Sequence, residues 1–123
     1  MALILDDEAS VRALLAKYLR KMGFKVLMSS TGDEASGILD SEEVDMAVVD
    51  LLMPGMDGFE FYGLVEKRWP HLKRKIIFAT GMVEERAALF AEAAGCQVLE
   101  KPFEKDRLYE AVSAIISAVR NTP

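Results

Sequence analysis

The sequence predicts a doubly wound α/β domain in which a five-stranded parallel sheet is covered by five helices. Two observations lead to this fold class: short apolar runs alternate with longer segments of helical periodicity, and the alternation repeats five times along the chain. At 123 residues, the chain fits a single domain spanning 1–123 with its own hydrophobic core. We expect the strand order 2-1-3-4-5, which makes the first and third strands neighbours.

The predicted strands are short and consist mainly of aliphatic side chains. Each is nearly continuous in apolar residues, which is typical of parallel strands that are covered on both faces. The predicted ranges are Ala2 to Leu5, Lys25 to Ser29, Met46 to Val49, Lys75 to Thr80 and Gln97 to Leu99.

The segments between these strands have the periodicity and the end signals of helices. The first helix has an apolar stripe made of Val11, Leu14, Leu15, Tyr18, Leu19 and Met22. Gly23 ends that helix, Pro70 ends the third and Gly95 ends the fourth. The later helices are predicted at Asp33 to Leu39, Phe59 to Trp69, Glu84 to Ala94 and Lys105 to Arg120. The last of them has the stripe Leu108, Val112, Ile115 and Val119.

Composition and charge narrow the classes of function. The net charge of −5 argues against a surface that neutralises phosphates, so we expect no direct nucleic acid binding. Cys96 is the single cysteine and cannot form an internal disulfide, which favours a reducing compartment. No apolar stretch reaches the roughly 20 residues that span a bilayer. We therefore expect a cytoplasmic domain without membrane insertion.

Charged and hydroxyl side chains gather where the predicted strands end. In chain order they are Asp6, Asp7 and Glu8 after the first strand, Asp50 after the third, Thr80 at the end of the fourth and Lys101 after the fifth. In open α/β sheets, ligands bind beyond the carboxyl ends of the strands. Because the first and third strands are expected to be neighbours, the three aspartates should lie close together. The threonine and the lysine should flank them.

This set of side chains predicts a cation site and phosphoryl transfer. Three carboxylates at close range repel, and one would take up a proton near neutral pH unless a cation is present. Carboxylate oxygens suit Mg²⁺. An ionised Asp50 can act as a nucleophile toward phosphorus, while Mg²⁺, Lys101 and Thr80 stabilise the equatorial oxygens of the transferred group.

Four segments in this order, each at a strand end, carry a resemblance to a known family. They are LILDDE, VVDLLMPGMDG, FATG and LEKPF. Together they resemble the receiver domain of bacterial two-component response regulators, which has a flavodoxin-like fold. The resemblance extends from Ala2 to about Val119 and therefore covers nearly the whole chain.

The resemblance implies a role for each residue at the strand ends. Asp50 would be the phosphoacceptor, and Asp6 would hold a metal-bound water. The Mg²⁺ ligands would be Asp7, Asp50 and the backbone carbonyl of Leu52. The side chains that contact the phosphoryl group would be Thr80 and Lys101. The loop that brings the carbonyl to the metal would be shaped by Pro54, Gly55 and Gly58.

The resemblance also implies a signalling function and its partners. The domain would take a phosphoryl group from a histidine kinase or a histidine phosphotransfer domain and would catalyse only its own phosphorylation and dephosphorylation. The partner would dock beside the first helix, near Ser10, Val11, Arg12 and Leu14. A homodimer through the fourth and fifth helices is a further expected partner. The segments IIFATG and VLEKPF are most similar to receivers of hybrid sensor histidine kinases, and a free regulator and a piece of a longer protein both fit.

Three local features of the sequence lead to further expectations. Val98 stands where receivers often have an aromatic residue that turns inward on phosphorylation, so the usual coupling to the threonine is in doubt. The Lys101–Pro102 peptide is expected to be cis. Leu52 and Met82 would flank the path of the hydrolytic water, and neither side chain can hold it, which predicts slow loss of the phosphoryl group.

Two alternatives from other classes stay open. One is an interaction module on the same fold that acts without phosphorylation, although such modules normally lose Asp50, Asp7 or Lys101. The other is a small Mg²⁺-dependent phosphatase of the haloacid dehalogenase type. That family needs its nucleophile and its general acid two residues apart after the first strand, and DDEAS lacks this spacing.

Overall fold

The computed structural model describes residues 1–53, 55–81 and 85–120, excepting the side chains of residues 119 and 120. These residues form one parallel sheet with the strand order β2-β1-β3-β4-β5, as the sequence predicted. The strands are β1 (Ala2–Leu5), β2 (Val26–Ser29), β3 (Met46–Asp50), β4 (Ile76–Thr80) and β5 (Gln97–Glu100). The helices are α1 (Ala9–Lys21), α2 (Gly32–Ser41), α3 (Gly58–Arg68), α4 (Glu85–Ala94) and α5 (Lys105–Arg120), and a short 3-10 turn, η1, covers Pro70–Leu72.

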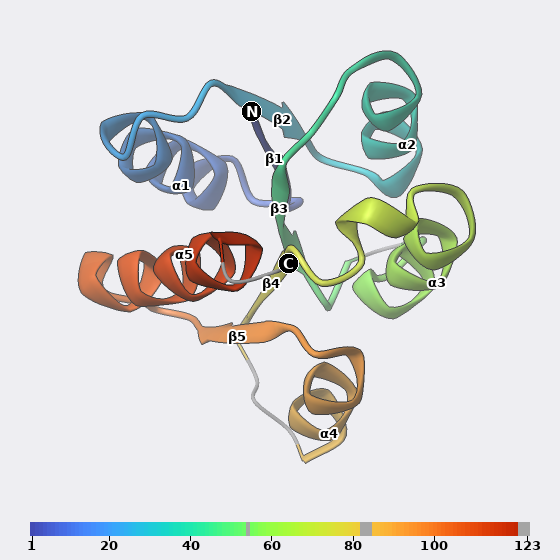
Figure 1. The fold of residues 1–123 in the computed structure, drawn as a ribbon. Helices are drawn as coiled ribbons and strands as arrows, with labels where there is room; N and C mark the ends of the chain where they lie inside the picture. The colour runs from blue at the N-terminus through green and yellow to red at the C-terminus, as the bar shows by residue number, and fades with distance from the viewer. Residues whose placement is uncertain (54, 82–84, 121–123) are drawn as a thin grey trace.

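The helices form two layers around the sheet. Helices α1 and α5 cover one face, while α2, α3 and α4 cover the other (Figure 1). Each face has its own hydrophobic core. Leu15, Leu19 and Leu108 belong to the core under α1 and α5, whereas Phe61, Val65 and Phe78 belong to the opposite core. Strands β1, β3 and β4 are buried along their whole length, which explains why their sequences lack alternation.

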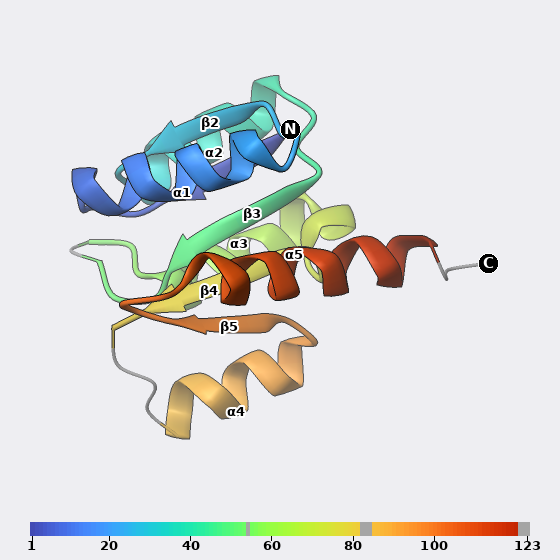
Figure 2. The same cartoon turned by 90° about the vertical axis from the view of Figure 1, so that its left-hand side faces the viewer.

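The parallel strands end at the same edge of the sheet. Register pairs Leu5 with Val49 and Asp50 with Ala79, so the carboxyl ends of β1, β3 and β4 are level with one another. Figure 2 shows β3, β4 and β5 pointing in one direction. The fold therefore brings the residues that directly follow β1, β3, β4 and β5 to one edge of the sheet.

The element boundaries differ from the prediction by one or two residues. Lys25 and Lys75 were expected to open strands, but they lie just before β2 and β4. Their carbonyls nevertheless accept hydrogen bonds from the neighbouring strands, at 2.7 Å from the Ala2 N–H and 3.0 Å from the Ala47 N–H. Strand β3 continues through Asp50, one residue beyond the predicted end. The predicted start of the fourth helix, Glu84, lies outside the described residues.

Side-chain caps fix where two of the helices begin. The Thr31 hydroxyl accepts a hydrogen bond from the Glu34 N–H at 3.1 Å and begins α2. The Asp57 carboxylate accepts one from the Glu60 N–H at 2.9 Å and begins α3. Each cap satisfies an amide that has no partner within its helix. The cap at Asp57 places the start of α3 at Gly58, one residue before the predicted start.

An aromatic cluster attaches α4 to the rest of the domain. The buried residues of α4 are the small side chains of Ala87 and Ala91. Phe90 adds a large ring, whose centroid lies 5.6 Å from that of Phe78 on β4 and 4.8 Å from that of Phe59 on α3, both edge to face. Val98 on β5 lies beside Phe78 in the sheet register.

Among the described residues, no helix has the length and hydropathy needed to cross a bilayer.

Candidate functional site

Asp50 ends strand β3 at the edge where the loops gather. Asp50 is only 4% exposed, although burying a carboxylate without partners costs free energy. Its Oδ1 accepts a hydrogen bond from the Leu52 N–H at 3.1 Å. The acid is therefore the last residue of a buried strand and is oriented by the loop that follows it.

The loop after Asp50 closes tightly on that residue. The Gly58 N–H donates to the Leu51 carbonyl at 3.1 Å, which joins the two ends of the loop. A Cβ atom on Gly58 would lie 2.5 Å from the Asp50 carbonyl oxygen and 2.7 Å from the Leu51 Cα, so a side chain cannot fit there. Gly55 has a φ of 79°, which favours glycine. Pro54, expected to help shape the loop, lies outside the described residues.

Asp6 follows β1 and is more deeply buried than Asp50. Its exposed fraction is 1%, and both carboxylate oxygens have partners. Oδ1 accepts the Glu8 N–H at 2.9 Å, and Oδ2 accepts the Lys101 ammonium at 2.6 Å. The Asp6 N–H donates to the Ser29 carbonyl at 3.1 Å and so continues the pairing of β1 with β2. Asp6 is therefore fixed in both its backbone and its side chain.

Lys101 joins the ends of three strands. Its ammonium lies 2.6 Å from Asp6 Oδ2 and 3.4 Å from Asp50 Oδ2. Its backbone N–H donates to the Thr80 carbonyl at 2.7 Å, and Thr80 is itself only 1% exposed. The Lys101–Pro102 peptide is cis, as predicted from the resemblance. The structure thus brings together Asp6, Asp50, Thr80 and Lys101 from four different strand ends.

The surroundings shift the pKa values of the two facing charges in the same direction. Burial raises the pKa of the Asp50 carboxyl to about 6, against the opposing effects of the Leu52 N–H and the Lys101 charge. Burial alone would lower the pKa of Lys101. The hydrogen bond to Asp6 and the nearby carboxylate charges outweigh that effect and raise it above its ordinary value. At neutral pH the lysine is charged, and Asp50 is ionised in an environment that favours its protonated form.

A group of three acids beside this lysine has the chemistry of a metal site. Ligand oxygens of Asp6, Asp7 and Glu8 all lie within 4.8 Å of one another. Asp6 is buried, whereas Asp7 and Glu8 are exposed and can meet an ion from solvent. Carboxylates that face water on one side fit Mg²⁺, which retains several waters when it binds to a protein. The Lys101 ammonium contacts both Asp6 of this group and Asp50, so it links Asp50 to the group.

A protein-family model matches most of the sequence of this chain. The model of the response regulator receiver domain matches residues 2–113. The chain belongs to the receiver domain family. Receiver domains are signalling domains with a phosphoacceptor role, and they generally bind Mg²⁺ at an acidic cluster.

Curated relatives of this receiver are response regulators. The transcriptional regulatory protein GlrR of Escherichia coli K12 is 31% identical over 110 residues, which cover 89% of this chain and 24% of that protein. The hydrogenase transcriptional regulatory protein HoxA of Cupriavidus necator is 34% identical over 116 residues, covering 94% of this chain and 24% of HoxA. The chain therefore spans about a quarter of the length of these two relatives.

Solved structures show the same fold. The response regulator TrrA of Thermotoga maritima, crystallised in complex with Mg(2+)-BeF, superimposes with a TM-score of 0.81 at 31% identity. The match covers 93% of this receiver and 96% of that chain. The receiver domain of an HD domain-containing protein from Pseudomonas fluorescens has a TM-score of 0.87 at 20% identity, covering 98% and 97% of the two chains.

Two residues contact this site although the sequence prediction did not assign them to it. Glu8 joins the acidic group, and its N–H orients Asp6. Arg12 was expected on a docking surface, but its guanidinium Nη1 donates to the Asp6 backbone carbonyl at 2.7 Å. The position of Glu8 directly after Asp6 and Asp7 is a sequence signal that could have assigned it to the acidic group. A bond from a helical arginine to a carbonyl leaves no such signal in the sequence.

The raised pKa of Asp50 leads to a direct test. In the metal-free receiver, the Asp50 carboxyl should titrate with a midpoint near 6, and adding Mg²⁺ should move that midpoint to lower pH because the cation favours the ionised form. The measurement is the pH dependence of the carboxyl ¹³C chemical shifts by NMR. The Asp50→Asn variant identifies the resonance by its loss. A midpoint near 4 without Mg²⁺ would contradict the prediction.

Proposed function

We propose that this receiver takes a phosphoryl group from a phosphohistidine onto Asp50 in a Mg²⁺-dependent reaction and then changes conformation to signal to a partner. The observation that carries the proposal is the Lys101 ammonium, which contacts Asp6 at 2.6 Å and Asp50 at 3.4 Å at the rim of an acidic group. A buried carboxylate beside a fixed cation and a metal-binding group is suited to attack on phosphorus.

In the reaction, an Asp50 carboxylate oxygen attacks phosphorus while the bond from phosphorus to the donor imidazole breaks. The imidazole keeps the electron pair of that bond, and an acyl phosphate forms on Asp50. Lys101 neutralises charge on the transferred group, and the Thr80 hydroxyl binds one of its oxygens. Asp7, Asp50 and the Leu52 carbonyl would hold Mg²⁺, with Asp6 on a metal-bound water. When bound, Mg²⁺ supplies charge neutralisation to the phosphoryl oxygens.

A hollow beside Asp50 supports a docking position for the phosphohistidine. It has a volume of about 460 Å³ and opens between the loops, next to Asp50, Gly81 and Lys101. Its apolar wall is formed by Val11, Leu14, Leu52 and Phe103. Leu14 is 37% exposed and Leu52 is 53% exposed, so both present apolar surface to an incoming helix. The donor would be a histidine kinase or a histidine phosphotransfer domain.

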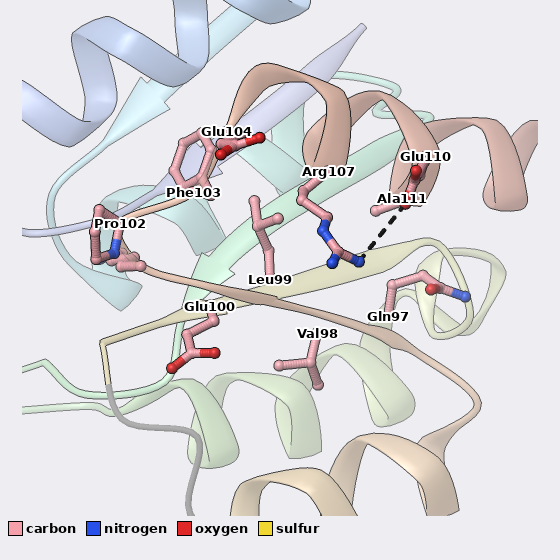
Figure 3. A pocket seen from close by; sticks show the side chains of 11 residues that line it. Gln97, Val98, Leu99, Glu100, Pro102, Phe103, Glu104, Arg107, Glu110 and Ala111 are labelled. Carbon is pink, nitrogen blue, oxygen red and sulfur yellow. Dashed lines mark ion pairs between the residues drawn. The ribbon is translucent and has the colours of Figure 1, made fainter.

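The face made by α4, β5 and α5 is the proposed surface for the output partner or for a second copy of the chain. Leu89 on α4 is 57% exposed. Between β5 and α5 lies a groove of about 720 Å³, where Arg107 and Glu110 of α5 form an ion pair at 3.9 Å (Figure 3). With a net charge of −5, the chain itself is not expected to bind nucleic acid. We also expect a cytoplasmic location.

Incubation with Mg²⁺ and acetyl phosphate, followed by intact mass measurement, tests the proposal against its alternatives. A receiver gains a single phosphoryl group. An interaction module that acts without phosphorylation gains none. A phosphatase shows multiple turnover and gives continuous release of inorganic phosphate.

Asp50→Asn should abolish the adduct and stabilise the fold. The amide is nearly isosteric but far less nucleophilic. Because folding raises the pKa of Asp50 from 3.8 to about 6, ionisation weakens the fold as pH rises through that window. The variant should therefore be more stable by about 3 kcal/mol at pH 7, and the difference should fall below about 1 kcal/mol at pH 4. Intact mass and urea unfolding at both pH values measure this. A remaining aspartyl adduct would contradict the assignment.

Leu14→Glu should slow phosphoryl transfer from a phosphohistidine donor by about tenfold and leave labelling by acetyl phosphate unchanged. A charge on the wall of the hollow opposes protein docking but not entry of a small donor. The matched control is Leu89→Glu, which puts the same charge on an exposed leucine of α4 and should not affect transfer. Equal loss with both donors would indicate misfolding and would remove the support for docking at α1. Arg12 does not serve as a docking probe because it contacts Asp6.

The phosphorylated state should persist for minutes or longer. Leu52 borders the site with an apolar side chain that cannot orient a water for in-line attack. Met82, the second residue in this prediction, lies outside the described residues. Leu52→Asn combined with Met82→Glu should speed hydrolysis by about tenfold, equivalent to about 1.4 kcal/mol of barrier. Leu52→Met is the control. Decay of the acyl phosphate is followed by mass, and a wild-type half-life of seconds would refute the prediction.

A further inference from the structure

Arg12 connects helix α1 to the acidic turn in front of it. Arg12 is half-buried, and its guanidinium donates from Nη1 to the Asp6 backbone carbonyl at 2.7 Å. Its own N–H donates to the Glu8 carbonyl at 3.1 Å as part of the first helical turn. Residue 12 is thus bonded to both ends of the turn that carries Asp6, Asp7 and Glu8.

The Asp6 carbonyl needs this donor. The register of β1 with β2 and β3 ends at Leu5, and the Asp6 N–H makes the last bond to β2, so the Asp6 carbonyl lies beyond the paired residues. Asp6 is 1% exposed, and a buried carbonyl without a partner costs free energy. The guanidinium supplies a charged donor, which makes a stronger hydrogen bond than a neutral one.

With Arg12 included, Asp6 is held at three acceptor atoms. The backbone carbonyl is held by Arg12, Oδ1 by the Glu8 N–H and Oδ2 by Lys101. The two carboxylate bonds fix the side chain only if the backbone that carries it is fixed as well. The bond from the Asp6 N–H to Ser29 fixes the peptide unit before Asp6, and the contact from Arg12 fixes the one after it, which joins Asp6 to Asp7.

The charge of Arg12 works against this arrangement. A positive side chain close to the acidic group repels a second cation, so on Coulomb grounds Arg12 should weaken Mg²⁺ binding. Positioning the carboxylates has the opposite effect on affinity. The two roles therefore predict opposite signs when the side chain is removed, and one measurement separates them.

We propose that Arg12 is a positioning residue, which holds the Asp6 backbone so that the carboxylates of the turn keep the arrangement that binds Mg²⁺. The metal part of this inference rests on the proposed function. The turn itself does not depend on it, since the three hydrogen bonds to Asp6 are present in the described structure.

The test compares Arg12→Ala, Arg12→Lys and the control Lys17→Ala, which removes one positive charge from an exposed position on the same helix. Isothermal titration with Mg²⁺ alone should show about tenfold weaker binding for Arg12→Ala, at the lower limit of effects seen for outer partners of metal ligands. Arg12→Lys keeps a donor and a charge and should recover most of the affinity. Lys17→Ala should match the wild type or bind slightly more tightly.

A second readout needs no metal. Amide hydrogen exchange of Glu8, measured by NMR on the metal-free receiver, should be about tenfold faster in Arg12→Ala and close to wild type in Arg12→Lys and Lys17→Ala. Unchanged or tighter Mg²⁺ binding by Arg12→Ala, or unchanged Glu8 exchange, overturns the proposal. If that variant fails to fold, Arg12→Gln replaces it, because the shorter neutral side chain cannot span the distance to the Asp6 carbonyl, and wild-type Mg²⁺ affinity in Arg12→Gln would refute the role. A wild type that binds no Mg²⁺ would refute the proposed function, while Glu8 exchange would still test Arg12.

Discussion

A single partly buried ammonium group, that of Lys101, holds this edge of the domain together. Lys101 follows the edge strand β5, yet its side chain reaches Asp6 after β1 and Asp50 at the end of β3. A lysine at this depth requires carboxylate partners, and removing one member of such a group leaves an uncompensated charge. The strand order, the level strand ends and the loop after β5 all have to be correct for this contact to form. The ion pair is therefore a property of the whole fold.

The same contact leaves the site short of positive charge. Asp6 and Asp50 are both buried, and one lysine serves them both while Asp7 and Glu8 add further negative charge nearby. Burial raises the pKa of the Asp50 carboxyl to about 6, and the negative charge of Asp6 acts in the same direction. A site that gives up stability in this way is typical of function rather than of structural support. A bound cation would reduce the shortage of positive charge.

The sequence predicted the strands and the site for one physical reason. Strands buried on both faces leave continuous apolar runs, and parallel strands bring the residues after those runs to one edge. Asp6, Asp50, Thr80 and Lys101 could therefore be located before the structure was known. Boundaries were less certain because a cap such as Asp57 determines where a helix starts, and it depends on one hydrogen bond. Arg12 could not be assigned because its partner is a backbone carbonyl, which carries no sequence signal.

Val98 changes how the site can be connected to the outer helices. In the sheet register it lies beside Phe78, two residues before Thr80, and its small side chain leaves the aromatic packing on this face to other residues. Phe90 of α4 takes part in that packing, with edge-to-face contacts to Phe78 and Phe59. Phe59 lies at the start of α3, just after the loop that carries Leu52. That loop and the end of β4 are therefore connected to α4 through aromatic rings on β4 and α3 rather than through a ring on β5.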